Sequence, residues 1–195
     1  MSQNIIVTST ESSDPIKQYE IALANYSFLW IVYFRGHWCP FCMSYLKTLQ
    51  SLLPSIGGAG GKVLIVTAEP ATHLPATRKA TGYVGEAVVD PEHKLATMLK
   101  EKGLLDVQIT KKAGYEFGVA QPAILVQKGR GAGEGEILFD WVIVPRTMNL
   151  GGAKDRPDLT QIWDNVQAKL QGKPVVHAQY SLTSFTGMIW SKIFG

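Results

Sequence analysis

Residues 29–42 read LWIVYFRGHWCPFC, an apolar run followed by a Cys-x-x-Cys pair in which Pro40 comes directly after Cys39. The run is rich in β-branched and aromatic residues, which is typical of a strand buried on both faces at the centre of an α/β sheet. After Cys39, apolar residues recur at helical spacing as far as about Ile56, so the sequence predicts an amphipathic helix that begins at the first cysteine. Both cysteines of the chain lie at this junction, and we expect any thiol chemistry to occur here.

The expected chemistry of Cys39 and Cys42 follows from their place at the start of a helix. Cys39 takes the N-cap position and Pro40 the first helical position, where its missing N–H has no cost. The N–H groups of Phe41 and Cys42 can donate to the Cys39 sulfur, and the helix dipole favours a thiolate, so the pKa of Cys39 should fall from about 8.5 to between ~3.5 and ~7.5. We therefore expect the Cys39 thiolate to attack a disulfide or peroxide and Cys42 to resolve the product.

Two other interpretations of the cysteines stay open. They could be buried structural residues, or they could supply half of a tetrahedral metal site, with His37 as an awkwardly placed third ligand or with a cluster shared between two chains. A Cys-Pro-x-Cys at a strand end that opens an amphipathic helix favours the redox pair over both. We accordingly expect no metal and no other cofactor.

The rest of the chain predicts an α/β protein. Strands and helices alternate first and a hairpin follows, which indicates a central mixed sheet with an antiparallel hairpin edge and helices on both faces. Residues 1–172 are expected to form one domain, and residues 173–195 a tail. The expected elements are a strand at 4–10, a helix from Pro15 to about 26, strands at 28–34 and 62–67, a helix at 71–83, an extended piece at 86–90, a helix from Pro91 to about 102, an irregular loop at 104–118, strands at 123–127 and 136–144, and a last helix capped by Asp158.

Composition excludes several classes of function. The 195 residues are 46% hydrophobic and 18% charged, which is typical of a globular protein, and the net charge of +3 from scattered basic residues gives no reason to expect nucleic acid as a partner. The N-terminus lacks a signal or transit pattern, so we expect a cytoplasmic protein. The tail has an apolar face at helical spacing over 181–194; we expect it to pack on its own domain or in a homodimer rather than on a membrane.

Pro122 is a second signal, because a proline directly before a buried strand cannot donate to the ladder. Either a cis Gln121–Pro122 bond faces the thiol pair or an ordinary trans proline begins the strand.

Several side chains near the thiols are candidates for supporting roles. Arg35 could stabilise a thiolate or orient a peroxide, or it could cap the sheet end and face water. Trp38 is expected to be a wall of the site, and His37 an exposed side chain that could move protons. Arg146 and Arg156 flank a glycine-containing loop that could close over the site, although we expect them to be solvated charges or partners of nearby aspartates.

The run Tyr33-Phe34-Arg35-Gly36-x-Trp38-Cys39-Pro40-Phe41-Cys42, with Leu46, Leu49 and Gln50, resembles the thioredoxin superfamily and, more closely, the peroxiredoxin-like branch of the alkyl hydroperoxide reductase/thiol-specific antioxidant (AhpC/TSA) group. Later segments at 89–91 and 117–119 are similar to that group as well. The resemblance implies a thioredoxin-like fold, with Cys39 as nucleophile and Cys42 as its partner. It also implies that Pro122 corresponds to the cis-proline that faces the active cysteine in this family.

Three positions depart from the patterns of these families. Val32 and Gly36 stand where typical peroxiredoxins have a proline and a Thr or Ser, so the hydroxyl that would bind peroxide is missing. Tyr33 stands where typical thioredoxins have a buried carboxylate, so a proton for Cys42 must come from the Tyr33 hydroxyl, His37 or water. The Cys-Pro-Phe-Cys centre looks like that of glutaredoxins, which allows glutathione as reductant beside thioredoxin.

The sequence therefore predicts an enzyme, a thiol–disulfide oxidoreductase or peroxiredoxin-like antioxidant protein. The alternative is a descendant of the fold that has lost general redox activity and acts as a binding protein or as a specialised enzyme on a small molecule.

Overall fold

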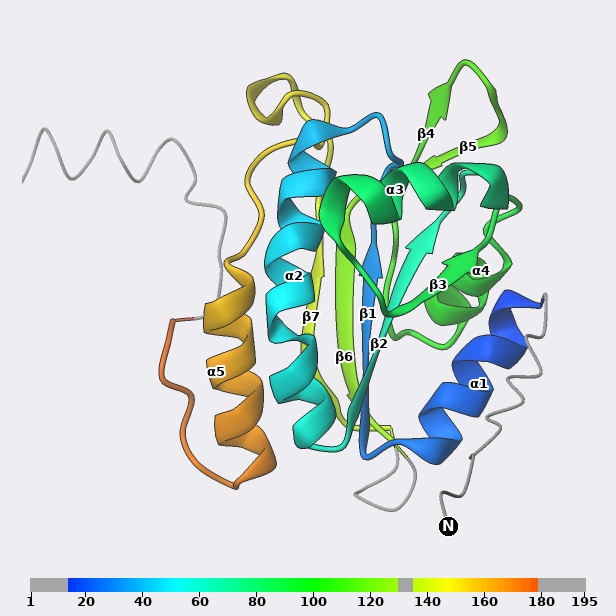
Figure 1. Ribbon diagram of the computed structural model, residues 1–195. Coiled ribbons are helices and arrows are strands. Elements are labelled where there is room, and N and C mark those ends of the chain that lie inside the picture. The colour runs from blue at the N-terminus through cyan, green and yellow to red at the C-terminus, as the bar shows by residue number, and fades with distance from the viewer. Residues whose placement is uncertain (1–13, 130–134, 179–195) are drawn as a thin grey trace, which may run out of the picture.

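Five strands form the central sheet of the computed structural model, in the order β3-β2-β1-β6-β7 (Figure 1). The structure describes residues 14–129 and 135–178. Strands β1, β2 and β3 are parallel to one another, β6 is antiparallel to β1, and β7 is antiparallel to β6. The strands are β1 (Phe28–Tyr33), β2 (Gly61–Thr67), β3 (Glu86–Val89), β6 (Ala123–Lys128) and β7 (Ile137–Val142). The mixed sheet and its antiparallel hairpin edge confirm the predicted thioredoxin-like fold.

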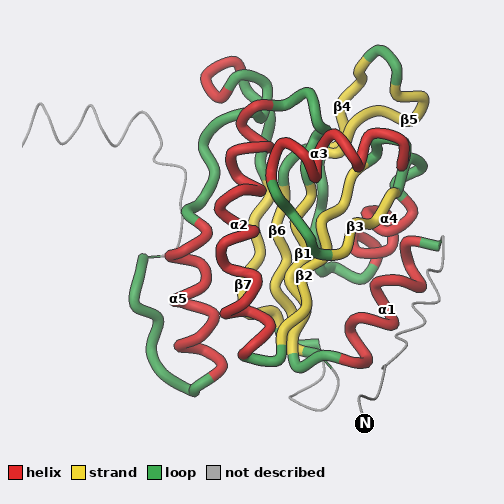
Figure 2. The backbone as a smooth tube through the Cα atoms, in the orientation of Figure 1, coloured by secondary structure: helices red, strands yellow, loops and turns green. Residues whose placement is uncertain are grey.

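Helices cover both faces of this sheet, as Figure 2 shows. One face packs against α2 and α5, and the other against α1 and α4. The alternation of side chains along β1 divides the core accordingly: Trp30, Val32 and Phe34 face α2 and α5, whereas Ile31 and Tyr33 face the opposite side. The helices are α1 (Pro15–Asn25), α2 (Pro40–Gly58), α3 (Leu74–Thr81), α4 (Lys94–Glu101) and α5 (Leu159–Leu170), with 3-10 turns η1 (Ala71–His73) and η2 (Thr147–Asn149).

Helix caps explain where the helices start. The Asp14 carboxylate accepts backbone N–H bonds from Ile16 and Lys17 at the start of α1, with Pro15 in the first turn. Asp158 caps α5 in the same way. The predicted start of the fourth helix at Pro91 is wrong, because Asp90 accepts N–H bonds from Lys94 and Leu95 and the helix begins only at Lys94.

The segment predicted as an irregular loop at 104–118 contains two strands instead. Strands β4 (Ile109–Lys112) and β5 (Tyr115–Ala120) form a separate antiparallel pair, which lies near the end of the sheet where α2 begins (Figure 1). Most of their residues up to Phe117 are exposed or only partly buried and polar, so no apolar alternation marks the strands. The predicted strand at 4–10 and the apolar tail at 181–194 lie outside the described residues.

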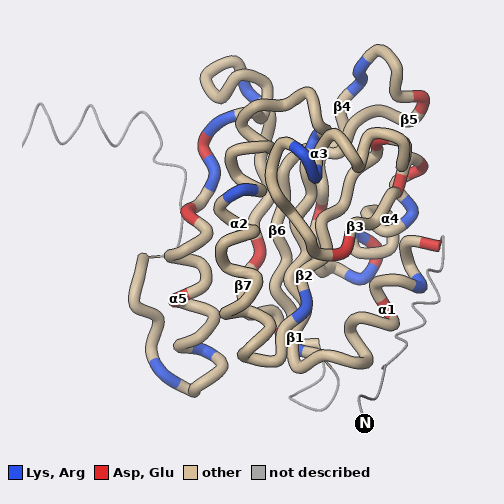
Figure 3. Tube along the Cα trace, viewed as in Figure 1, with Lys and Arg blue, Asp and Glu red and all other residues tan. Residues whose placement is uncertain are grey.

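Charges are spread over the surface rather than gathered. Figure 3 shows basic and acidic positions interspersed over helices and loops. Within residues 14–129 and 135–178, every helix is too short or too polar to cross a bilayer.

Candidate functional site

The two cysteines lie at the start of α2, at the carboxyl end of β1. Cys39 occupies the predicted N-cap position, and Pro40 is the first helical residue. The Cys42 backbone N–H donates to Cys39 Sγ at 3.4 Å, and the Cys39 N–H donates to the Gly36 carbonyl at 3.1 Å. Both thiols are free, and both side chains are buried, with 1% of Cys39 and none of Cys42 exposed. The local sequence thus fixes two sulfur atoms beneath the surface at a helix N-terminus.

The two thiols differ in acidity. The pKa of Cys39 is lowered to about 6 by hydrogen bonds from the Cys42 side chain and backbone and by the nearby guanidinium groups of Arg156 and Arg35, with burial acting in the opposite direction. Burial and the hydrogen bond to Cys39 raise the pKa of Cys42 well above its usual value. Near neutral pH the pair therefore consists of a thiolate at Cys39 and a thiol at Cys42.

Arg156 reaches this pair from the loop before α5. Its Nη2 donates to Cys42 Sγ at 3.2 Å, and its guanidinium carbon lies 5.3 Å from the centre of the Tyr45 ring. The loop is tied to α2, because the Tyr45 hydroxyl donates to the Pro157 carbonyl at 2.7 Å. The expectation of a solvated charge is therefore wrong for Arg156, whereas Arg146 is exposed.

Arg35 and Trp38 lie together at the end of β1. The Arg35 guanidinium carbon is 4.8 Å from the centre of the Trp38 ring, and Lys112 Nζ is 4.0 Å from the same centre. The Arg35 backbone N–H also donates to Cys42 Sγ at 3.5 Å. The partly buried Trp38 ring holds two cations next to the thiol pair.

A buried carboxylate that sequence reasoning missed organises the loop between β1 and α2. Glu69, which is 3% exposed, follows β2 and accepts hydrogen bonds from the His37 backbone N–H at 2.7 Å and from the Tyr115 hydroxyl at 3.0 Å. The His37 ring makes a second contact with the carboxylate, with Nδ1 2.8 Å from Glu69 Oε1. Trp38 Nε1 in turn donates to the Tyr115 hydroxyl at 2.7 Å.

Gly36 makes this arrangement sterically allowed. A Cβ atom at Gly36 would lie 2.5 Å from Glu69 Cδ and 2.6 Å from Trp38 Nε1, and the residue has φ +148°, which disfavours other residues. The absence of a hydroxyl here, noted from the sequence, thus has a structural reason. An acidic residue just after a parallel strand could have indicated Glu69, because the carboxyl ends of such strands meet at one edge of the sheet.

The His37 ring faces Glu69, with Nδ1 2.8 Å from Oε1 of the carboxylate. The same ring stacks on that of His73, with centroids 4.6 Å apart and an interplanar angle of 11°. His73 ends η1 and is exposed; nothing in the sequence pattern had singled it out.

Pro122 lies at the same end of the sheet, but its expected geometry is wrong. The register pairs Ala123 with Tyr33, which places Pro122 just beyond the end of β1. None of the peptide bonds in residues 14–129 and 135–178 is cis, so the Gln121–Pro122 bond is trans. The Pro122 carbonyl accepts a hydrogen bond from the Ile143 N–H at 3.0 Å, and the preceding Gln121 side chain donates to Thr110.

Tyr33 cannot serve as the proton source suggested by the sequence. Its side chain belongs to the core on the α1 and α4 face, whereas Cys39 and Cys42 belong to the core on the α2 and α5 face. Burial, together with Asp90 and Tyr19, raises its pKa well above 10.

Several solved structures with a similar fold are peroxiredoxins. Peroxiredoxin 6 of Arenicola marina matches 85% of this chain and 72% of its own, with a TM-score of 0.60 and 12% sequence identity. AhpC of Enterococcus faecalis matches 80% of this chain and 83% of its own, with a TM-score of 0.56 and 15% identity. The reduced 2-Cys peroxiredoxin of Plasmodium vivax matches 77% of this chain and 81% of its own, with a TM-score of 0.53 and 13% identity. At these identities the likeness shows the fold alone.

No curated protein sequence matches the chain. A family model does: the model described as the AhpC/TSA family matches residues 9–126, which include both cysteines and Glu69. Because that match covers more than half of the chain, the protein belongs to the AhpC/TSA family of thiol-dependent antioxidant oxidoreductases.

Proposed function

We propose that this protein is a thiol peroxidase in which Cys39 is the nucleophile and Cys42 the resolving thiol. The observation that carries the proposal is the difference in acidity within one buried pair. With a pKa of about 6, the thiolate form of Cys39 outnumbers the thiol form by about ten to one at pH 7. Cys42, whose pKa is raised, stays protonated at its side. A thiolate is the nucleophilic form of cysteine, and a neighbouring thiol can capture its oxidised product.

The proposed reaction has two steps. The Cys39 thiolate attacks one peroxide oxygen, the O–O bond breaks, and the leaving oxygen takes a proton from solvent to give an alcohol or water, while Cys39 becomes a sulfenic acid. The Cys42 sulfur then attacks the Cys39 sulfur; water leaves with the Cys42 proton, and a Cys39–Cys42 disulfide forms. An external dithiol or two glutathione molecules reduce that disulfide by thiol–disulfide exchange.

Burial favours a peroxide over a protein disulfide as the substrate. Since only 1% of Cys39 is exposed, reaction requires a local opening at the sulfur, and a peroxide needs a smaller opening than a disulfide of another folded chain. Arg35 Nε and Arg156 Nε are buried donors to which the described part of the chain offers no acceptor. We propose that they bind the peroxide oxygens in place of the missing hydroxyl.

The alternative of a redox-inactive binding protein is not favoured. A scaffold without thiol chemistry has no need for an acidic sulfur at a helix N-cap beside an arginine.

Trapping of the sulfenic acid tests the proposal. The reduced Cys42→Ser protein should form a dimedone adduct at Cys39 within one turnover of hydrogen peroxide, detected by mass spectrometry. The wild-type protein should form the internal disulfide instead, and Cys39→Ser should form neither product. An unmodified Cys39 in Cys42→Ser, in protein that circular dichroism shows to be folded, would contradict the proposed role.

A further inference from the structure

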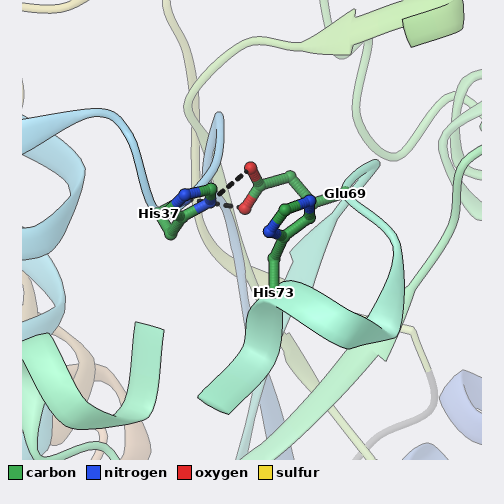
Figure 4. A group of neighbouring side chains, drawn as sticks. All are labelled: His37, Glu69 and His73. Carbon is green, nitrogen blue, oxygen red and sulfur yellow. Dashed lines mark hydrogen bonds and ion pairs between the residues drawn. The ribbon is translucent and has the colours of Figure 1, made fainter. Parts of the chain in front are cut away.

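Two imidazoles and one carboxylate meet at the loop that leads into Cys39, and they take no part in the proposed reaction. They belong to His37, Glu69 and His73, and one ligand atom of each lies within 4.8 Å of the corresponding atoms of the other two. Figure 4 shows the two rings and the carboxylate turned toward one another. Metal ions in proteins are bound by such groups in such proximity.

Each of the three side chains has a fixed origin in the fold. His37 comes from the loop after β1, Glu69 from the loop after β2, and His73 from η1 just beyond it. Because β1 and β2 are parallel neighbours, their carboxyl ends bring the first two residues together. The carboxylate is held at the bottom, with its side chain 4% exposed, while His37 is 35% exposed and His73 is open to solvent. An ion can therefore enter from the surface.

The carboxylate already has the outer hydrogen bonds that metal ligands usually receive. Tyr115 donates its hydroxyl proton to Glu69 Oε1, and the His37 backbone N–H donates to Oε2. Such partners fix the orientation of a ligating carboxylate, and their loss commonly weakens metal binding 10–100-fold.

From this geometry we propose that His37, Glu69 and His73 bind a divalent transition-metal ion, with Zn²⁺ as the best match. Two His and one Glu are a recognised zinc ligand set, which leaves the fourth position to water. Imidazole nitrogens select against Mg²⁺ and Ca²⁺, which prefer oxygen ligands. The site uses neither cysteine, and it departs from our sequence-based expectation that the protein has no metal.

Binding needs only local adjustment. Zn–ligand distances of about 2.0–2.1 Å place tetrahedral ligand atoms about 3.3 Å apart. His37 Nδ1 and Glu69 Oε1, which are now 2.8 Å apart, would have to separate by about 0.5 Å to ligate the ion, with the imidazole N–H on Nε2. His73, the exposed member, supplies the remaining movement by rotating its side chain. The bound ion would join the loop that carries Cys39 to η1.

The experiment must exclude zinc binding by the thiols. The full-length Cys39→Ser/Cys42→Ser protein contains no cysteine and has four histidines. Any polyhistidine tag must be removed, because it would itself bind Zn²⁺. Isothermal titration with Zn²⁺ should then give one ion per chain, and Co²⁺ should give d–d absorption typical of tetrahedral nitrogen and oxygen ligands. In this background His73→Ala should raise the Kd at least about tenfold, as should Glu69→Gln.

His177→Ala is the matched control. His177 Nε2 also lies 2.8 Å from a carboxylate, that of Asp164, and is similarly exposed, but the pair is not part of any three-ligand group in the described residues. We expect this variant to keep the Kd unchanged. Absence of stoichiometric zinc binding in the cysteine-free protein, or binding that His73→Ala leaves unaltered, would overturn the proposal; either result leaves the proposed peroxidase chemistry untouched.

Discussion

The Cys39–Cys42 pair and the Glu69 carboxylate follow neighbouring strands, yet their surroundings differ. Glu69 accepts three short hydrogen bonds, at 2.7, 2.8 and 3.0 Å, from His37 and Tyr115. The thiols accept longer ones, at 3.2 to 3.5 Å, and the charge near them is positive. A carboxylate with several charged hydrogen bonds holds the loop in place, whereas the Cys39 sulfur, which accepts one backbone N–H bond and is electrostatically favoured as an anion, keeps lone pairs for reaction. We infer that the Glu69 carboxylate positions the loop between β1 and α2, and that the Cys39 thiolate reacts with the substrate.

Removal of the nucleophile should have the largest effect. Cys39→Ser should lower kcat/KM for hydrogen peroxide at least roughly a thousandfold, because a serine hydroxyl stays protonated near neutral pH. Peroxide consumption with dithiothreitol as reductant measures this. Tyr33→Phe is the control, since the Tyr33 side chain belongs to the core on the other face of the sheet, and it should retain wild-type activity. Loss of activity in Tyr33→Phe would contradict the separation of the two faces.

A side chain at Gly36 should disrupt the carboxylate network. Gly36→Ala places a Cβ atom 2.5 Å from Glu69 Cδ at an unfavourable φ, so the free energy of unfolding should fall by about 2–4 kcal/mol. Urea denaturation measures the change. In Gly57→Ala, where the new Cβ meets no atom within 4 Å in α2, the protein should instead become slightly more stable, by up to about 1 kcal/mol. Equal effects in the two variants would refute the packing argument.

Neutralisation of Glu69 separates positioning from reactivity. Glu69→Gln keeps the shape but weakens the charged hydrogen bonds, so the free energy of unfolding should fall by about 1–3 kcal/mol. The pKa of Cys39, measured by thiolate absorbance, should stay near 6, because its causes are Cys42, burial, Arg156 and Arg35. Glu86→Gln, which breaks a partly exposed ion pair with Lys62, should cost at most about 1 kcal/mol. A clear shift of the Cys39 pKa in Glu69→Gln would show that the carboxylate acts on the thiol.

Removal of the Arg156 guanidinium, which donates to Cys42 Sγ, should have the smallest effect on the peroxide rate and the one that depends most on pH. The reactive thiolate of the wild type is present above pH 6 and lost as pH falls through about 6, so the peroxide rate should rise with pH and then level off. Arg156→Met removes a positive charge that lowers the pKa of Cys39, so that rise should move to higher pH. Together with the loss of a proposed peroxide-binding donor, this should lower the rate at pH 6 about three- to tenfold. Arg146→Met, at an exposed position, should follow the wild-type curve. Coincident curves for all three proteins would exclude Arg156 from tuning the thiol.

Local patterns predicted the parts of this molecule that depend on local physics. Asp14 with Pro15 marks the start of α1, and Cys39 with Pro40 the start of α2, because capping involves residues only two or three apart. The buried strands were recognisable from their apolar runs. The β4–β5 pair was not, since its exposed polar residues carry no such signal.

The contacts that complete the site join residues far apart in the chain. Glu69 bonds to His37 across 32 positions, and Arg156 to Cys42 across 114. Which of several loop charges reaches the sulfur depends on how the chain returns from β7 to α5, and composition does not encode that path. The prediction for the Gln121–Pro122 bond failed for the opposite reason: the cis geometry was taken from the family resemblance, and no local signal in this chain required it.

The N-cap position of Cys39 also bears on the redox balance of the pair. In the reduced protein, the thiolate accepts the Cys42 N–H and faces the positive end of α2, and both interactions stabilise that state. A disulfide sulfur carries no charge and accepts hydrogen bonds weakly, so oxidation gives up this stabilisation. Whatever favours the reduced form raises the reduction potential of the couple. The Cys39–Cys42 disulfide should therefore be readily reduced. A mild reductant is then sufficient to return the enzyme to its reduced, active form.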